Sequence, residues 1–197
     1  MKKILIVKYT PRHERSRTNI LLDYYIEKKT KDANVEILDL EENVPEFFSS
    51  ETLEIYYKRN YGWVELTQEE TELIKKFDDY TAQFKNADEV VFAYPMFNFW
   101  MPAIIKAYID MILQKWETWD MTSEWYVWLQ KDKRIVLITS SAWKYLWTDL
   151  DSFEHNIKLF RVYEWFIWSK LEVIDAGWIA YDEENVLNKA KAEIDLL

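Results

Sequence analysis

Short apolar runs alternate with helical patterns five times along this chain of 197 residues. The apolar runs occupy residues 4–7, 35–40, 89–94, 134–139 and 171–176. The helical patterns occupy residues 18–33, 67–85, 102–112, 149–167 and 182–197. The run at residues 4–7 is continuously apolar, as is typical of a parallel strand buried on both faces. The alternation therefore predicts an α/β fold, a parallel sheet with helices on both faces and right-handed crossovers.

Five strands joined in this way predict a doubly wound sheet of order 2-1-3-4-5. The chain has no internal repeat, low-complexity tract or linker, and its length suits one core, so we expect a single domain over residues 1–197. Ligands of such sheets bind beyond the carboxyl ends of the strands. The segments to examine for chemistry are therefore residues 8–19, 94–102 and 139–148.

Charge and composition exclude several classes of protein. The formal net charge of -10 argues against nucleic-acid binding, which needs a basic surface. No stretch approaches the roughly 20 apolar residues of a membrane span, and the apolar run at residues 4–7 is too short for a signal peptide. The chain has no cysteine and no metal-ligand spacing. We expect a cytoplasmic protein without bound metal, nucleic acid or membrane.

The first of the three segments contains Ser16, Arg17 and Thr18 at the start of a predicted helix. Hydroxyls, an arginine and the N–H groups of a helix end suit a phosphate monoester. Lys8, Arg12 and Arg15 add to a basic cluster in an otherwise acidic chain. An ordinary helix cap in a solvated basic loop explains the same residues, so this motif alone is weak.

The second segment, Pro95-Met96-Phe97-Asn98-Phe99, is more specific. Methionine, two aromatic rings and an asparagine after a strand can pack against a flat ring and hydrogen-bond its polar rim. A hydrophobic cap over the sheet explains the two phenylalanines equally well. It explains Asn98 less well.

This segment, together with Pro102-Ala103 and Lys106-Ala107-Tyr108-Ile109-Asp110, resembles the signature of the FMN-dependent NADH-azoreductases, also called NADH:quinone oxidoreductases. The resemblance extends to Ile138-Thr139-Ser140 and Ile179-Ala180-Tyr181. It implies a flavodoxin-like fold, bound FMN, and electron transfer from NADH or NADPH to quinones and azo compounds by a ping-pong mechanism. It also implies a homodimer with the flavin sites at the subunit interface.

The resemblance also implies which residues bind FMN, and that the flavin rather than a catalytic side chain carries the chemistry. These residues are Thr10, Ser16, Arg17, Thr18, Met96, Phe97, Asn98, Phe99, Ser140, Ser141, Ala142 and Trp143. The last loop departs from the family pattern SRGG, because Ser141 replaces arginine and Ala142 and Trp143 replace the glycines. A tryptophan at position 143 is expected to crowd the flavin.

Two other functions remain open. A flavodoxin-like electron-carrier module would bind FMN and serve a protein partner, and an acidic surface suits docking to basic partners. Against it, the chain lacks the longer run of hydroxyls and glycines that such carriers have after their first strand. A flavin-free scaffold with a degenerate pocket is the third possibility, and it gains weight if Trp143 is a native residue.

Glycine is unusually rare in this chain and tryptophan is unusually common. The chain has 2 glycines and 11 tryptophans, whereas ordinary glycine usage of about 7% predicts about 14 glycines. Tryptophan stands where the family pattern has glycine at positions Trp100, Trp125, Trp128, Trp143, Trp165, Trp168 and Trp178. We hypothesise that these codons are UGA, which some bacterial lineages read as glycine. The alternative is a protein with unusual aromatic turns.

Overall fold

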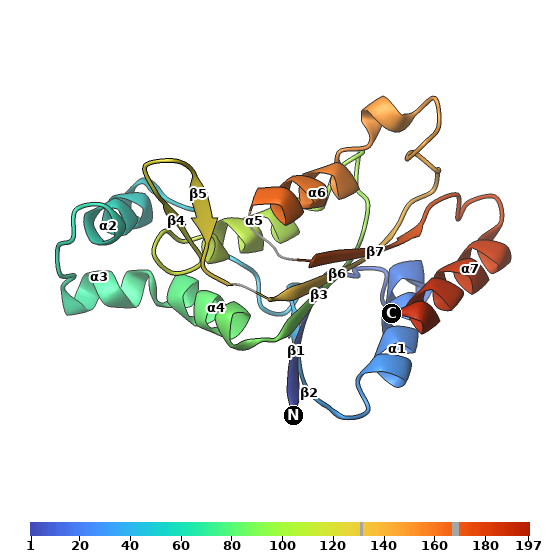
Figure 1. Ribbon diagram of the computed structural model, residues 1–197, viewed down its shortest axis with the longest axis horizontal. Coiled ribbons are helices and arrows are strands. Elements are labelled where there is room, and N and C mark those ends of the chain that lie inside the picture. Colours follow the sequence, from blue (N-terminus) through green and yellow to red (C-terminus); the bar gives the residue numbers. More distant parts are fainter. Residues whose placement is uncertain (131, 167–169) are drawn as a thin grey trace.

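The computed structural model describes residues 1–130, 132–166 and 170–197. At its centre lies a five-stranded sheet in the order β2-β1-β3-β6-β7, in which all neighbours are parallel (Figure 1). Its strands are β1 (Lys2–Lys8), β2 (Ala33–Asp39), β3 (Glu89–Pro95), β6 (Arg134–Ser140) and β7 (Lys170–Ala176). Counted along the chain, this order is 2-1-3-4-5, so the predicted flavodoxin-like sheet is confirmed.

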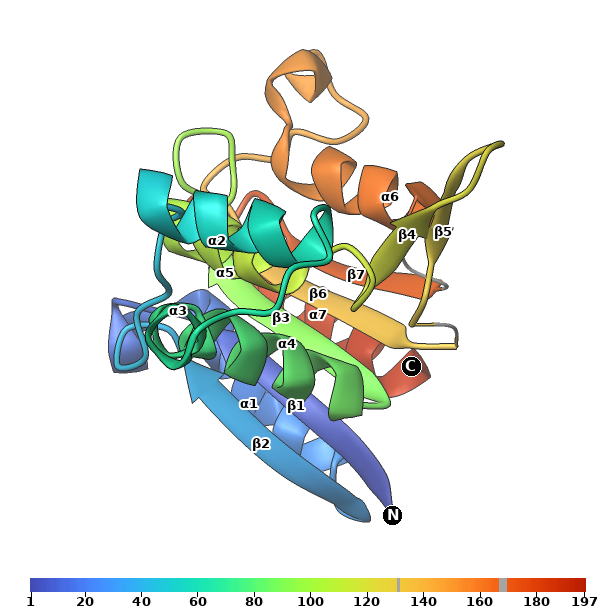
Figure 2. The same cartoon turned by 90° about the vertical axis from the view of Figure 1, so that its left-hand side faces the viewer.

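Helices cover both faces of the sheet (Figure 2). On one side lie α1 (Arg17–Lys29) and α7 (Glu183–Leu196), and on the other α4 (Lys75–Asn86), α5 (Ala103–Ile112) and α6 (Asn156–Phe166). Alternation along β1 supplies both cores, because successive side chains of a strand point to opposite faces. Ile4 and Ile6 pack with α1 and α7, whereas Leu5 and Val7 pack with α4, α5 and α6.

Three parts of the fold differ from the sequence-based expectation. An antiparallel pair of strands, β4 (Trp119–Met121) and β5 (Tyr126–Trp128), lies between α5 and β6 along the chain. It was not predicted because strands of three residues are too short to show a periodicity. The helix expected over residues 67–85 is divided at Ile74 into α3 (Gln68–Leu73) and α4. The helix α2 (Ser50–Asn60) lies in the long connection between β2 and α3, which none of the five helical patterns covers.

The start of α6 also differs from the prediction of a helix over residues 149–167. A short 3-10 turn, η2 (Asp151–Phe153), precedes the helix, which begins at Asn156. The buried carboxylate of Glu154 accepts hydrogen bonds from the backbone N–H groups of Ile157 and Lys158, at 2.7 and 3.1 Å. These bonds satisfy the free N–H groups of the first turn and so fix the start of the helix. Residue 167 lies outside the described residues.

At the amino-terminal edge of the sheet, a buried carboxylate joins three elements. Glu89, at the start of β3, is fully buried and accepts hydrogen bonds from the Tyr25 hydroxyl of α1, from Lys2 at 2.9 Å and from Arg134 at 2.7 Å. Burial alone raises the pKa of Glu89, but these donors outweigh it and hold that pKa below its usual value. The network lies at the opposite end of the strands from the segments expected to carry the chemistry.

Four tryptophans have backbone angles that favour glycine. Among the described residues, Trp63, Trp116, Trp147 and Trp178 have φ of 55, 71, 63 and 79°. This left-handed region is uncommon for non-glycine residues and is an outlier for a bulky one. Neither glycine of the chain, Gly62 or Gly177, has a positive φ. The backbone thus requires glycine at positions where the chain has tryptophan.

These positions overlap only in part with those selected from the family pattern. Trp178 has a positive φ, whereas Trp100, Trp125, Trp128 and Trp143 do not, so these four positions do not need glycine for their backbone angle. Trp165 lies within α6, and Trp168 lies outside the described residues. A sequence motif marks where glycine is usual but carries no information on the backbone angle. Conversely, no motif pointed to Trp63, Trp116 or Trp147.

No helix within the described ranges has both the length and the apolar composition that a membrane-crossing segment requires.

Candidate cofactor site

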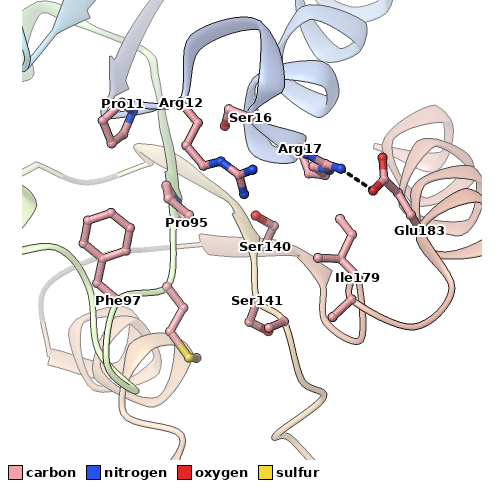
Figure 3. A pocket seen from close by; sticks show the side chains of 13 residues that line it. Pro11, Arg12, Ser16, Arg17, Pro95, Phe97, Ser140, Ser141, Ile179 and Glu183 are labelled. Carbon is pink, nitrogen blue, oxygen red and sulfur yellow. Dashed lines mark hydrogen bonds and ion pairs between the residues drawn. The ribbon is translucent and has the colours of Figure 1, made fainter.

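A cavity of about 450 Å³ lies beyond the carboxyl ends of β1, β3 and β6 (Figure 3). Four segments line it, and their residues are Pro11, Arg12, Ser16, Arg17, Pro95, Met96, Phe97, Ser140, Ser141, Ala142, Ile179, Ala180 and Glu183. Its size is ordinary for a small-molecule site. It lies where β1 and β3 lead their connections to opposite faces of the sheet, which is the switch point at which doubly wound folds bind ligands.

The amino end of α1 forms one wall of the cavity. A 3-10 turn, η1 (His13–Arg15), leads from β1 to Ser16, whose Oγ caps α1 by accepting the N–H of Asn19 at 3.2 Å. Within the described residues, the backbone N–H groups of Arg17 and Thr18 have no hydrogen-bond partner. A helix end with free N–H groups attracts anions through those donors and through the helix dipole.

Two arginines from the same segment line the cavity in different states. Arg17 forms an ion pair with Glu183 of α7 at 2.5 Å and donates a second hydrogen bond to the Arg15 carbonyl at 2.7 Å. The guanidinium of Arg12 points into the cavity and makes no hydrogen bond or ion pair with any described residue (Figure 3). The site therefore has one compensated and one uncompensated positive charge.

The turn after β3 forms the apolar wall. Phe97 and Trp100 exchange two backbone hydrogen bonds of 2.9 Å, and Asn98 and Phe99 between them have φ of 47 and 69°. Positive φ at both central residues is the mark of a type I′ turn, which tightly reverses the chain. Met96 and Phe97 line the cavity, and Phe97 packs edge-on against Tyr9 with ring centroids 6.1 Å apart.

Buried hydrogen bonds fix the end of β6 beneath the cavity. The hydroxyls of Ser140 and Thr18 lie 2.7 Å apart and join β6 to α1. On the other face of the sheet, buried Asn156 donates to the Thr139 hydroxyl at 3.1 Å and accepts from the Tyr94 hydroxyl at 2.9 Å. The floor of the cavity is thus tied to helices on both sides.

Seven of the twelve residues expected to bind the cofactor line this cavity: Ser16, Arg17, Met96, Phe97, Ser140, Ser141 and Ala142. Thr10 and Thr18 lie buried behind it, Thr10 donating to the Asn19 side chain at 3.3 Å. Asn98 and Phe99 lie at the exposed tip of the turn. The three segments selected from the sequence therefore meet, although not through every residue.

Trp143 does not line the cavity. Its indole packs against Trp178 and Tyr181, with ring centroids 5.7 and 4.9 Å apart. Residues 141–143 form the rim of the cavity. The backbone N–H groups of Ile179 and Ala180 donate hydrogen bonds to the carbonyls of Ser141 and Ala142 and hold this rim in place.

The sequence-based site lacked two charged residues of the cavity. Arg12 belonged to the basic cluster, but nothing in the sequence distinguished it from Arg15 or Lys8. Glu183 comes from the last helix, and no motif pointed to it. Ile179 and Ala180 were recognised as part of a family motif without being assigned to the site.

Beside this site, Asp175 of β7 lines a neighbouring cavity with Lys144 and Lys189. Burial, together with repulsion from Glu154 and Glu193, raises the pKa of Asp175 to about 6 against the attraction of Lys144 and Lys189. The segment that carries Lys144 continues directly from the rim at residues 141–143. The ionisation of Asp175 is therefore expected to change the stability of the fold beside residues 141–143.

Asp175→Asn is expected to stabilise the protein at pH 7 and to have little effect near pH 4. Because the pKa is higher in the folded state, the folded protein holds the proton more tightly, and stability falls as pH rises from about 4 to about 6. Urea unfolding at pH 4, 5, 6 and 7 measures this slope, with Asp32→Asn at an exposed turn as the control. An unchanged slope in Asp175→Asn would contradict the assignment.

A doubly wound sheet of this order, with an anion-binding helix end after β1 and a ligand cavity at the switch point, defines the flavodoxin-like class of α/β proteins. Comparison with known proteins agrees, since the sequence profile of the flavodoxin-like fold family matches residues 2–195.

Relatives of known activity narrow this class. The FMN-dependent NADH:quinone oxidoreductase of Brevibacillus brevis is 33% identical over 150 residues, which cover 74% of this chain and 71% of that protein. The FMN-dependent NADH:quinone oxidoreductase 2 of Halalkalibacterium halodurans is 29% identical over 98% of this chain and 97% of its own. Within the flavodoxin-like fold, this chain belongs to the family of the FMN-dependent NADH:quinone oxidoreductases.

Solved structures give the same result. The crystal structure of an azoreductase from Bacillus anthracis superposes with a TM-score of 0.86 at 25% identity, covering 100% of both chains. An FMN-dependent NADH-azoreductase of the same species, in complex with FMN, superposes with a TM-score of 0.86 at 26% identity, covering 100% of this chain and 97% of its own.

Proposed function

We propose that the cavity binds FMN and that the protein passes electrons from NADH or NADPH to quinones and azo compounds. One observation carries this proposal: an anion-binding helix end and an apolar wall face the same cavity. FMN joins a phosphate monoester to a flat ring system, so it needs both. The membership of the chain in a family of FMN-dependent enzymes supports the same ligand.

The residues present suit the two parts of the cofactor. The free N–H groups of Arg17 and Thr18 and the hydroxyl of Ser16 would hold the phosphate, and Met96 and Phe97 would provide an apolar surface for the ring system. Ser140, Ser141 and Ala142 border its other edge. Thr10 and Thr18 act from behind by fixing Asn19 and Ser140. Asn98, Phe99 and Trp143 form the outer rim.

Bound FMN would supply the redox chemistry of the reaction, the transfer of hydride and electrons. The chain's own residues hold the ring in one orientation and keep water from one side of it. The proposal includes a ping-pong scheme, in which the nicotinamide and the acceptor would use this cavity in turn. No side chain of the chain is assigned as a catalytic acid or base.

We further propose that the active form is a cytoplasmic homodimer in which the second subunit covers the cavity mouth. Phe97, Phe99 and Trp100, beside the cavity, are 42, 45 and 42% exposed. Clustered exposed aromatic side chains of this kind are typical of protein interfaces. Analytical ultracentrifugation of the purified protein tests the assembly, and a monomer at micromolar concentration would contradict it.

NADH oxidation, followed by absorbance, tests the proposed activity. We expect turnover with a small quinone and with an azo dye when FMN is present, and loss of turnover when FMN is removed. Reduction of a protein acceptor alone would instead identify an electron carrier. Absence of flavin binding and of turnover would identify a flavin-free scaffold.

A further inference from the structure

We propose that Arg12 is the residue whose charge recognises the phosphate of the flavin, and that Arg17 instead neutralises Glu183. This inference rests on the proposed function, because it assigns roles to residues around the same ligand. It reverses the expectation from the sequence, in which Arg17 was the cation beside the phosphate.

Arg17 is already committed to other partners. Its guanidinium bonds the Glu183 carboxylate at 2.5 Å and the Arg15 carbonyl at 2.7 Å, and it thereby connects the first turns of α1 and α7 (Figure 3). If Arg17 turned to the phosphate, Glu183 would remain unpaired in the wall of an anion-binding cavity. The carboxylate of Glu183 would then repel the phosphate, because both are negative. The ion pair between Arg17 and Glu183 therefore favours phosphate binding when it stays intact.

Arg12 has the opposite properties. Its backbone is held by the turn before α1, where His13 donates to the Thr10 carbonyl at 2.8 Å and Arg15 donates to the Arg12 carbonyl at 3.0 Å. Its side chain lines the cavity and bonds no described residue. A phosphate monoester carries a charge of about -1.5 to -2 at pH 7, which the two free N–H groups of α1 compensate only in part. A guanidinium completes the compensation with two parallel hydrogen bonds.

The net charge of the cavity follows from this division. Arg17 and Glu183 cancel, so Arg12 alone makes the phosphate end positive. Glu183 then limits the affinity of the site, because removing its charge frees Arg17 to act on the phosphate.

The effect of the phosphate can be isolated by comparing FMN with riboflavin, which lacks it. Dissociation constants for both are measured on apoprotein by flavin fluorescence, and circular dichroism verifies folding. Arg12→Ala is expected to weaken FMN binding about tenfold or more and to leave riboflavin binding unchanged. Arg12→Lys restores part of the loss. Arg15→Ala, which removes the same charge from the same turn outside the cavity, is the matched control and changes neither constant.

Arg17 and Glu183 are tested by a double-mutant cycle on FMN binding. Arg17→Ala exposes the carboxylate and weakens binding, whereas Glu183→Gln frees Arg17 and tightens binding several-fold. In the double variant the two changes offset each other, and the affinity returns to within about twofold of the wild type. If Arg17 contacted the phosphate directly, Glu183→Gln would relieve only the repulsion, and the double variant would still bind clearly more weakly than the wild type.

The outcomes separate this inference from the proposed function. Wild-type FMN binding that is tighter than riboflavin binding, with no effect of Arg12→Ala, overturns the role of Arg12 and leaves the flavin function intact. A double variant that binds FMN clearly more weakly than the wild type overturns the role of Arg17. A wild-type protein that binds neither flavin overturns the proposed function and the inference together.

Discussion

Replacing Trp63, Trp116, Trp147 and Trp178 together by glycine is expected to raise the free energy of unfolding by about 2–3 kcal/mol, with no single position contributing more than about 1 kcal/mol. Each of these residues has a positive φ. A bulky residue held in the left-handed region costs about 1–3 kcal/mol, and glycine removes that strain. The greater conformational freedom of glycine in the unfolded chain reduces this gain in the free energy of unfolding by about 0.5–1 kcal/mol per position.

Trp147 gives the sharpest single test because its side chain is 90% exposed and loses little packing when removed. Trp147→Gly is expected to stabilise the protein by about 1 kcal/mol, whereas Trp147→Ala keeps the strain and gains nothing. The other three tryptophans also lose ring contacts, such as Trp63 with Trp116 at 4.9 Å and Trp178 with Tyr181 at 4.6 Å. Their individual gains are therefore smaller.

Trp119→Gly is the control, since Trp119 has no positive φ and its indole donates to the Leu113 carbonyl at 3.1 Å. It is expected to lose stability. Chemical denaturation of all the variants measures these changes. A quadruple glycine variant less stable than the wild type would show that the tryptophans are native. The nucleotide sequence gives an independent answer, because UGG codons at these positions end the recoding hypothesis.

Glu89→Ala is expected to lower the free energy of unfolding by about 3–5 kcal/mol, which is the usual effect of breaking a buried ion pair. The substitution leaves the buried Tyr25 hydroxyl and the half-buried Arg134 guanidinium without their carboxylate partner. It also opens a space at the start of β3. Glu54→Ala, at an exposed position of α2, is the matched control and should change stability little.

The pH dependence of this contribution has a definite sign. Because the pKa of Glu89 is lowered in the folded state, its stabilisation is complete above the ordinary carboxyl pKa and is lost as pH falls through the lowered value. The difference in stability between wild type and Glu89→Ala should therefore shrink in acid. A constant difference from pH 7 down to acid denaturation would contradict this explanation.

The sheet could be predicted from the sequence because its strands appear as short segments rich in apolar residues that alternate with helical patterns. The β4–β5 pair could not, since three residues per strand are too few for a pattern. The start of α6 was missed because Glu154 caps the helix from within a polar stretch that also satisfies a helical periodicity.

The candidate site could likewise be predicted only in part, because some of its contacts depend on residues far apart in the sequence. Met96 and Phe97 directly follow β3, and Ser16 lies in the connection after β1, so the topology of the sheet brings them together. The partner of Arg17 comes from α7, 166 positions along the chain, and no local pattern reveals which arginine it engages. The positive φ values of Trp63, Trp116 and Trp147 likewise depend on the turns that surround them.

The two ends of β3 do different work. Glu89 at its start anchors the buried network, and Pro95 at its end borders the cavity, seven residues and about 20 Å along one strand. Substitutions separated by such a distance have nearly additive effects on stability. Substitutions in the cavity walls can therefore change which electron acceptors bind, and they leave the contacts that stabilise the sheet unchanged. In a family whose members reduce different compounds, this separation makes the scaffold evolvable.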